Sequence, residues 1–273
     1  MEQGPIGIFD SGYGGLTVLR EIVKVLPDHD FLYLGDNART PYGNRSFKTI
    51  YEYTLESVKY LLNEGCPLII LACNTASAKA LRTIQQRDLP GLAPDRRVLG
   101  VIRPTAEVIG QYSQTGHVGV LGTSGTVNSE SYLLEIKKQS PELKVFQQAC
   151  PMWVPLVENG EHDSEGADYF VEKYLRELFS QSGKIDTLLL ACTHYPLLIE
   201  KIMTRIPAGI AVLNQGEIVA PSLEDYLNRH PEISDFCLKN HQLRFLTTDE
   251  TENFNKKAKT FFGQSILSEF VHL

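Results

Sequence analysis

The sequence lacks the features of a membrane or exported protein. Its longest apolar runs, such as residues 68–73 and 188–192, are far shorter than the roughly 18 residues that a membrane-spanning helix needs. The N-terminus has no basic start followed by a long apolar stretch, because Asp10 interrupts the apolar residues 6–9. We therefore expect a cytoplasmic protein with no membrane partner.

Basic residues are also scarce relative to acidic ones. The chain has 26 Lys and Arg against 33 Asp and Glu, a formal net charge of −7, and no stretch is dense in Lys or Arg. A nucleic-acid-binding surface normally needs such a basic excess, so nucleic acid is not an expected partner. The 42% of hydrophobic residues is typical of a globular chain, and 273 residues allow two modest domains or one large one.

Cysteine is present, but not in the patterns of disulfide or zinc proteins. There are five, an odd number, and none forms a C-x-x-C pair. In a reducing compartment such cysteines are reactive or buried rather than paired. Cys192 and His194 have no further ligands at zinc spacing, so we expect no metal. Cys66, Cys150 and Cys237 are expected to be structural.

Short apolar runs alternate with amphipathic segments along most of the chain. Runs of this kind, bounded by turn residues, indicate buried strands of parallel sheets. Residues 47–64 have helical periodicity and are followed by Gly65, which suits a helix C-terminus. The fold class is therefore predicted to be α/β. The predicted strands cover residues 6–10, 31–36, 68–73, 98–102, 118–122, 145–149, 187–192 and 211–214. A further strand is predicted at residues 243–246, in a tail that packs back on the first lobe.

The chain also resembles itself. Residues 6–11 match residues 118–123, and residues 68–75 match residues 187–194, with an Ala-Cys pair at the same place in both of the latter. We interpret this as two pseudo-symmetric lobes, each with a mostly parallel four-stranded sheet flanked by helices, and with the active site in the cleft between them. The first lobe is assigned to residues 1–100 and 215–273, and the second to residues 101–214.

The repeated cysteines, Cys73 and Cys192, stand at the carboxyl ends of predicted strands, where open parallel sheets bind ligands. A helix is predicted to follow each, and the positive end of a helix dipole favours the reactive thiolate. The alternative is a small buried hydrophobic residue that happens to be cysteine. Two equivalent ionisable groups suit racemisation, which needs a base on one face of a carbon and an acid on the other.

Other polar residues gather at the same strand ends. Asp10 opens a Gly-rich turn that has neither phosphate-binding consensus, and it would bind an ammonium group, assist proton transfer or cap a helix. Backbone N–H groups in the loop of Tyr42 and Gly43 would suit a carboxylate. His194 would support the Cys192 thiolate when protonated, and Glu158 would pair with it.

With these motifs in place, the chain resembles the glutamate racemases of the aspartate/glutamate racemase superfamily. The resemblance covers nearly the whole chain, and the two Cys motifs together are specific. It rests on residues 7–12 (GIFDSG), 36–43 (from Asp36 to PYG), 71–76 (LACNTA), 122–127 (GTSGTV), 149–158 (ACP and VPLVE) and 191–198 (ACTHYPLL).

The resemblance implies a cofactor-independent interconversion of L- and D-glutamate that supplies D-glutamate for peptidoglycan, and hence for the cell wall and cell shape. Cys73 would be the base toward D-glutamate and Cys192 toward L-glutamate, and a homodimer is commonly formed. Arg103 and the pair Asn214-Gln215 depart from the family's usual pattern. Asp10, Glu158 and His194 would assist catalysis, and the substrate would be held by Asp10, Ser11, Tyr42, Gly43, Asn74, Thr75, Thr126, Thr193 and His194.

Two other functions remain open from the sequence. One is a related enzyme, either an aspartate racemase or an isomerase or decarboxylase that uses a single thiolate. The other is a two-lobed amino-acid-binding protein without catalytic activity. Replacement of each cysteine by serine separates the first, and a racemisation assay separates the second.

Overall fold

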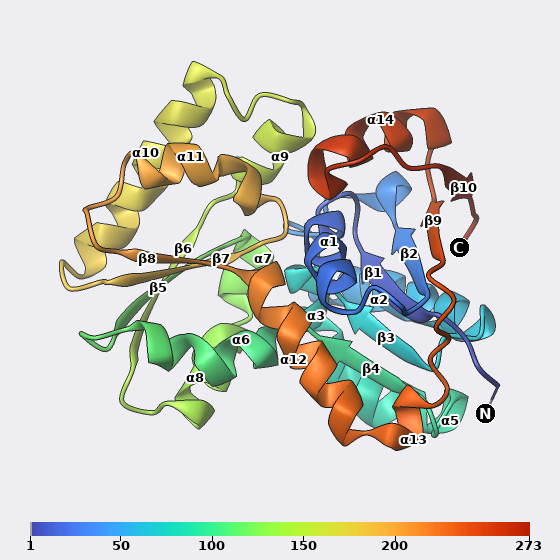
Figure 1. Cartoon of the computed structure of the whole chain (residues 1–273). Helices are drawn as coiled ribbons and strands as arrows, with labels where there is room; N and C mark the ends of the chain where they lie inside the picture. Colours follow the sequence, from blue (N-terminus) through green and yellow to red (C-terminus); the bar gives the residue numbers. More distant parts are fainter. Residues whose placement is uncertain (1) are drawn as a thin grey trace.

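The protein contains two separate parallel sheets, each covered by helices, and we call each sheet with its helices a lobe (Figure 1). The computed structural model describes residues 2–273. The first sheet has the strand order β10-β9-β2-β1-β3-β4, and the second has the order β6-β5-β7-β8. All neighbouring strands run parallel. The strands are β1 (Ile6–Asp10), β2 (Phe31–Gly35), β3 (Leu68–Leu71), β4 (Arg97–Gly100), β5 (His117–Gly122), β6 (Lys144–Ala149), β7 (Thr187–Ala191), β8 (Ala211–Asn214), β9 (Leu243–Thr247) and β10 (Ser268–Phe270).

Helices cover both faces of the two sheets, which explains the continuous apolar strand sequences. Every residue of β1, β2, β3 and β7 is buried, as parallel strands between helical layers must be. The α-helices are α1 (Gly15–Val25), α2 (Phe47–Asn63), α3 (Asn74–Lys79), α4 (Leu81–Thr83), α5 (Leu89–Leu92), α6 (Ile102–Val108), α7 (Ser124–Asn128), α8 (Ser131–Gln139), α9 (Trp153–Glu158), α10 (Glu165–Gln181), α11 (Ile199–Met203), α12 (Gln215–Arg229), α13 (Pro231–Ser234) and α14 (Thr251–Phe262). Residues 2–273 also contain the 3-10 helices η1 (Asn37–Arg39), η3 (Ile109–Tyr112) and η4 (Tyr195–Leu198) and the π-helix η2 (Ile84–Asp88).

The predicted α/β class is confirmed, and the two sheets share one arrangement. The order β2-β1-β3-β4 in the first lobe equals the order β6-β5-β7-β8 in the second. The strands that match in sequence, β1 with β5 and β3 with β7, therefore hold equivalent places. The prediction of four strands in each sheet is wrong for the first, because the C-terminal segment adds β9 beside β2 and β10 beside β9.

Helix α12 joins the lobes. It begins directly after β8 at Gln215 and runs across to pack on α1 of the first lobe (Figure 1). The two helices approach so closely that a Cβ atom on Gly216 would lie 3.2 Å from the backbone oxygen of Thr17. The start of α12 is therefore fixed by both lobes. Among residues 2–273, none of the helices has the length and apolar character that crossing a membrane would require.

Candidate active site between the lobes

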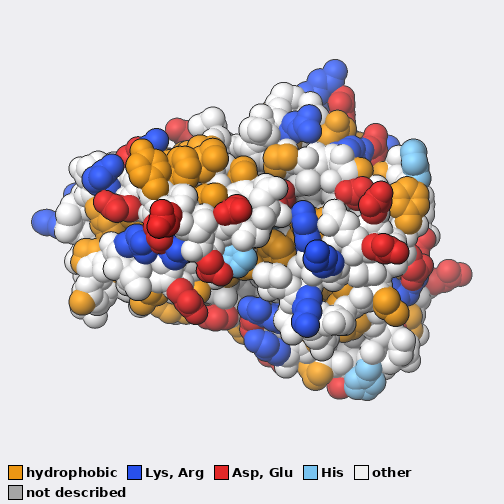
Figure 2. Space-filling view, turned by 90° about the horizontal axis from the view of Figure 1, so that it is seen from above, with side chains coloured by type: hydrophobic (Ala, Val, Ile, Leu, Met, Phe, Trp, Pro, Cys, Tyr) orange, Lys and Arg blue, Asp and Glu red, His pale blue; other side chains and the backbone are white. Residues whose placement is uncertain are grey.

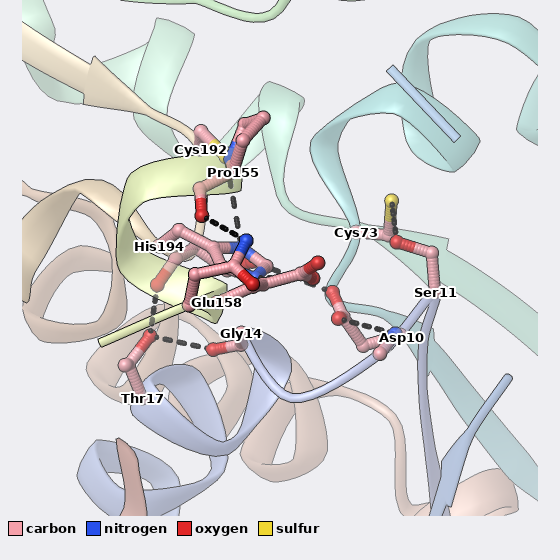
Figure 3. Close-up of polar contacts among 12 residues, drawn as sticks. Asp10, Ser11, Gly14, Thr17, Cys73, Pro155, Glu158, Cys192 and His194 are labelled. Atoms are coloured by element: carbon pink, nitrogen blue, oxygen red, sulfur yellow. Dashed lines mark hydrogen bonds and ion pairs between the residues drawn. The ribbon is translucent and has the colours of Figure 1, made fainter. Parts of the chain in front are cut away.

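Strand ends from both sheets meet at one place, and the two cysteines of the repeat lie there. Cys73 follows β3 and Cys192 follows β7, while Asp10 ends β1. The hydroxyl of Thr17 on α1 donates to the backbone oxygen of Thr193 at 3.0 Å, which ties the lobes together beside the site. Figure 3 shows Cys73 with Asp10 on one side and Cys192 with His194 and Glu158 on the other.

Cys73 is held at the start of α3 in the first lobe. Its Sγ accepts a hydrogen bond from the backbone N–H of Ala76 and donates one to Oγ of Ser11, both at 3.5 Å. Only 6% of the residue is exposed. Burial, together with the nearby charge of Asp10, raises the pKa of the Cys73 thiol to about 12 against the opposing effect of these two bonds. The helix start does lower the pKa of this thiol, as expected from the sequence, but burial outweighs that effect here.

Cys192 has a different neighbour, the imidazole of His194. The distance from Sγ to Nδ1 is 4.0 Å, and Nε2 of the same ring lies 3.1 Å from Oε1 of Glu158. Burial by itself lowers the pKa of His194, but the hydrogen bonds with Cys192 and Glu158 outweigh it and raise this pKa to about 10. At neutral pH His194 is therefore a cation beside the Cys192 sulfur.

Asp10 connects the two halves of the site. Its carboxylate is fully buried and accepts the backbone N–H of Gly12 at 3.0 Å and the hydroxyl of Thr193 at 3.5 Å. Burial raises the pKa of Asp10, and the positive charge of His194 opposes this increase. Gly14 holds the N-cap position of α1. The Asp10 carboxylate also accepts a hydrogen bond from the backbone N–H of Gly15, the first residue of that helix, in keeping with the predicted capping role.

The smaller polar residues also come together across the lobes. Thr75 on the first lobe lies 3.0 Å from Thr123 on the second, and Thr123 lies 3.1 Å from Thr126. The backbone N–H of Gly125 donates to the oxygen of Gly43 at 2.7 Å. Tyr42 is buried, and its hydroxyl donates to Asp36, so it supports this loop from behind.

Asn74, which was predicted to hold the substrate, has its carboxamide bonded elsewhere. Its Nδ2 donates to Gln215, and its Oδ1 accepts the hydroxyl of Tyr132, both at 2.6 Å. Because its side chain is engaged in these bonds, Asn74 can offer a substrate only its backbone N–H, at the start of α3.

The sequence reasoning did not single out Gly14 and Thr123 as site residues. A Cβ atom on Gly14 would lie 2.1 Å from Oγ1 of Thr193 and 2.5 Å from Nδ1 of His194. Only glycine fits at this position. The sequence feature that could have indicated such a close contact is the high glycine content of residues 12–15. Thr123 could not be found from the sequence, because its contact with Thr75 depends on how the two lobes pack.

The two sulfurs are enclosed by the contact between the lobes. Cys192, like Cys73, is only 6% exposed. A cavity of about 870 Å³ lies elsewhere between the lobes, along α3, α6, α8 and α12, and neither cysteine lines it. Seen from above, a group of Lys and Arg side chains lies near the junction, while Asp and Glu side chains are spread over both lobes (Figure 2). In the first lobe, Nζ of Lys257 on α14 lies 5.3 Å from the ring centre of Tyr13.

Known proteins resemble the chain over its full length. The sequence profile described as Asp/Glu/Hydantoin racemase matches residues 6–223. The glutamate racemase of Streptococcus suis is 40% identical and covers 100% of both chains. That of Geobacter metallireducens is also 40% identical, over 94% of this chain and 92% of its own.

Solved structures agree with this similarity. A crystal structure of a Bacillus anthracis glutamate racemase superposes with a TM-score of 0.90 at 33% identity, covering 100% of this chain and 99% of the other. The glutamate racemase of Francisella tularensis, solved in complex with D-glutamate, has a TM-score of 0.87 at 30% identity, covering 100% and 98%. The chain is therefore a member of the Asp/Glu/hydantoin racemase family and an isomerase.

Proposed function

We propose that the protein interconverts L- and D-glutamate with its two cysteines as acid and base, without a cofactor. The observation that carries the proposal is the placement of Cys73 and Cys192, from equivalent strand ends of different sheets, on opposite sides of one enclosed site. The names of the relatives in Streptococcus suis and Geobacter metallireducens support glutamate as the substrate.

In the direction from L- to D-glutamate, Cys192 acts as the thiolate. It removes the α-proton, the C–H bond breaks, and its electron pair remains on the substrate as a carbanion stabilised by the carboxyl group. The thiol of Cys73 then gives its proton to the opposite face of the α-carbon. This produces D-glutamate and leaves Cys73 as thiolate, and the reverse direction exchanges the roles.

The surroundings of the two sulfurs support this starting state. The raised pKa of Cys73, about 12, keeps it protonated as the acid, and burial is the main cause. Cys192 lies beside His194, whose pKa of about 10 makes it a cation at neutral pH, held by hydrogen bonds with Cys192 and Glu158 against the effect of burial. A cation beside one sulfur and a buried carboxylate near the other would assign the base and the acid to different lobes.

The remaining polar groups would bind the substrate. Asp10 would face the ammonium group, and the backbone N–H groups of the loop around Gly43 and at the start of α3 would suit the carboxylates. Because both cysteines are buried, the lobes would separate to admit glutamate and close again around it. The hydroxyls of Ser11, Thr75, Thr126 and Thr193, with Tyr42, Asn74 and His194, complete the proposed binding set.

The cellular role follows from the product. D-glutamate would be supplied for bacterial peptidoglycan in the cytoplasm, in support of cell-wall synthesis and cell shape, and the protein would act as a homodimer. We further propose that residues 1–100 and 215–273 move as the first lobe and residues 101–214 as the second.

The test is loss of circular dichroism from L-glutamate on addition of the purified protein without pyridoxal phosphate. We expect racemisation to a zero signal. Turnover of L-aspartate in place of glutamate would support an aspartate racemase, and tight glutamate binding without turnover would support a binding protein. Alkylating agents should label Cys73 and Cys192 with protection by glutamate; labelling only at Cys66, Cys150 or Cys237 would refute the site.

A further inference from the structure

A closed ring of three hydrogen bonds joins the lobes directly behind Cys73. Asn74 Nδ2 donates to Gln215 Oε1, Gln215 Nε2 donates to the Tyr132 hydroxyl, and that hydroxyl donates to Asn74 Oδ1, each at 2.6 Å. Every member both donates and accepts. Hydrogen bonds in such a ring polarise one another, so the ring is stiffer than three separate bonds.

The ring is sealed from water. Tyr132 is 0% exposed, Asn74 2% and Gln215 3%. Gln215 is also anchored outside the ring, because its Nε2 lies 3.0 Å from the backbone oxygen of Val101, which accepts from it. A buried polar group that loses its hydrogen-bond partner pays the full cost of its removal from water. Breaking any one bond of the ring is therefore energetically unfavourable.

The three members come from three separate elements. Asn74 is the first residue of α3, directly after Cys73, while Tyr132 belongs to α8 and Gln215 begins α12. The position of α3 in the first lobe is thereby fixed against α8 of the second. The first turn of α3 also contains Ala76, whose backbone N–H donates to Cys73 Sγ. A shift of Asn74 would therefore also move the hydrogen-bond donor that holds the sulfur.

We infer that Gln215 is a positioning residue that holds Cys73 in place against the substrate through Asn74 and Tyr132. It does not touch the reacting atoms. The inference rests on the proposed racemisation and deepens it: Gln215 acts on the Cys73 half of the two-base reaction and leaves the Cys192 half unchanged.

The test uses Gln215→Met, which keeps the length of the side chain and removes its hydrogen bonds, and Tyr132→Phe, which removes one hydroxyl. We expect kcat/KM to fall by up to about 100-fold, the size of effect that a 1 Å misplacement produces. The fall must be equal for L- and D-glutamate, because the equilibrium constant between enantiomers is one.

The deciding readout is the primary deuterium isotope effect with substrates labelled at the α-carbon. With proton transfer at Cys73 made slower, the isotope effect on D-glutamate should rise, because Cys73 breaks that C–D bond. The effect on L-glutamate should fall, because cleavage at Cys192 then precedes the slow step. A purely structural role for Gln215 would lower the amount of active protein and change neither isotope effect.

The control is Thr54→Val, which removes another buried hydroxyl, one that donates to Ile50 at 2.7 Å inside α2. It should lower the unfolding temperature and keep both isotope effects at their original values. If Gln215→Met does not fold, Tyr132→Phe decides alone. Active variants with unchanged isotope effects would overturn the inference, whereas an unsubstituted protein without racemisation would overturn the proposed function instead.

Discussion

The Nε2 atom of His194, on the loop after β7, lies 3.1 Å from Oε1 of Glu158 at the end of α9. Both side chains are largely buried, with 5% and 15% of their surface exposed. A buried ion pair of this kind is costly to break from one side, because the remaining charge loses its partner. The ion pair should therefore affect both the activity and the stability of the protein, and substitution of Glu158 tests both.

Replacement of Glu158 by Gln should move the pH profile of racemisation. The hydrogen bond to the Glu158 carboxylate is one cause of the His194 pKa of about 10, alongside that to Cys192 and against burial, so the variant should lose the His194 cation at lower pH. We expect kcat for L-glutamate to fall roughly tenfold at pH 9 and less at pH 6, which is below the roughly 10²–10⁴-fold loss of a whole acid–base group because His194 itself remains. The control is Glu161→Gln, at an exposed position, which should leave the pH profile unchanged. If the profile of Glu158→Gln coincided with that of the original protein, Glu158 would not be needed to keep His194 protonated.

The same variant should change stability in a pH-dependent way. The folded pKa of His194 lies above its unfolded value of about 6.5, so protonation stabilises the fold. This stabilisation is fully present below about pH 6.5 and is lost as the pH rises toward about 10. Urea unfolding of the original protein and Glu158→Gln should therefore give a gap in unfolding free energy that is widest near pH 6 and narrows toward pH 10. A gap that widens with pH would contradict this assignment.

Substitution of Gly14 by Ala should disable the site without a change of polarity. The added methyl group would lie 2.1 Å from Thr193 Oγ1 and 2.5 Å from His194 Nδ1, so one of them must move. We expect activity to fall at least about tenfold and the unfolding free energy by roughly 1–3 kcal/mol, the usual cost of overpacking. Gly91→Ala is the matched control, because its methyl group would meet nothing within 4 Å. Full activity of Gly14→Ala would show that the close contact of Gly14 with Thr193 and His194 is not needed for turnover.

Replacement of either site cysteine by Ser should stop racemisation. A serine hydroxyl is far too weak an acid to exchange protons with an α-carbon, so Cys73→Ser and Cys192→Ser should each lose roughly 10²–10⁴-fold in turnover. Cys237→Ser is the control, because its Sγ donates only to the backbone oxygen of Ile233, a bond that serine can keep. Survival of turnover in one of the two site variants would indicate an enzyme that uses a single thiol.

Much of the fold was predictable because its signals are local. The apolar runs of β1, β3 and β7 and the helical period of α2 depend on neighbouring residues, and Gly65 does adopt the positive φ, 89°, expected after α2. Strand β10 was not predictable, because its three residues Ser268–Phe270 carry no apolar pattern and pair only with β9.

The sequence by itself determined the α/β class, the internal repeat and the pair Cys73 and Cys192, since each depends on spacing along the chain. Tertiary structure alone decided the surroundings of those cysteines. The two Ala-Cys segments look alike in sequence and both cysteines are buried. Yet one sulfur lies near Asp10, and the other lies 4.0 Å from a histidine that is held by Glu158. Electrostatic energy depends on distance and burial through space, and only the packing of the two lobes fixes these.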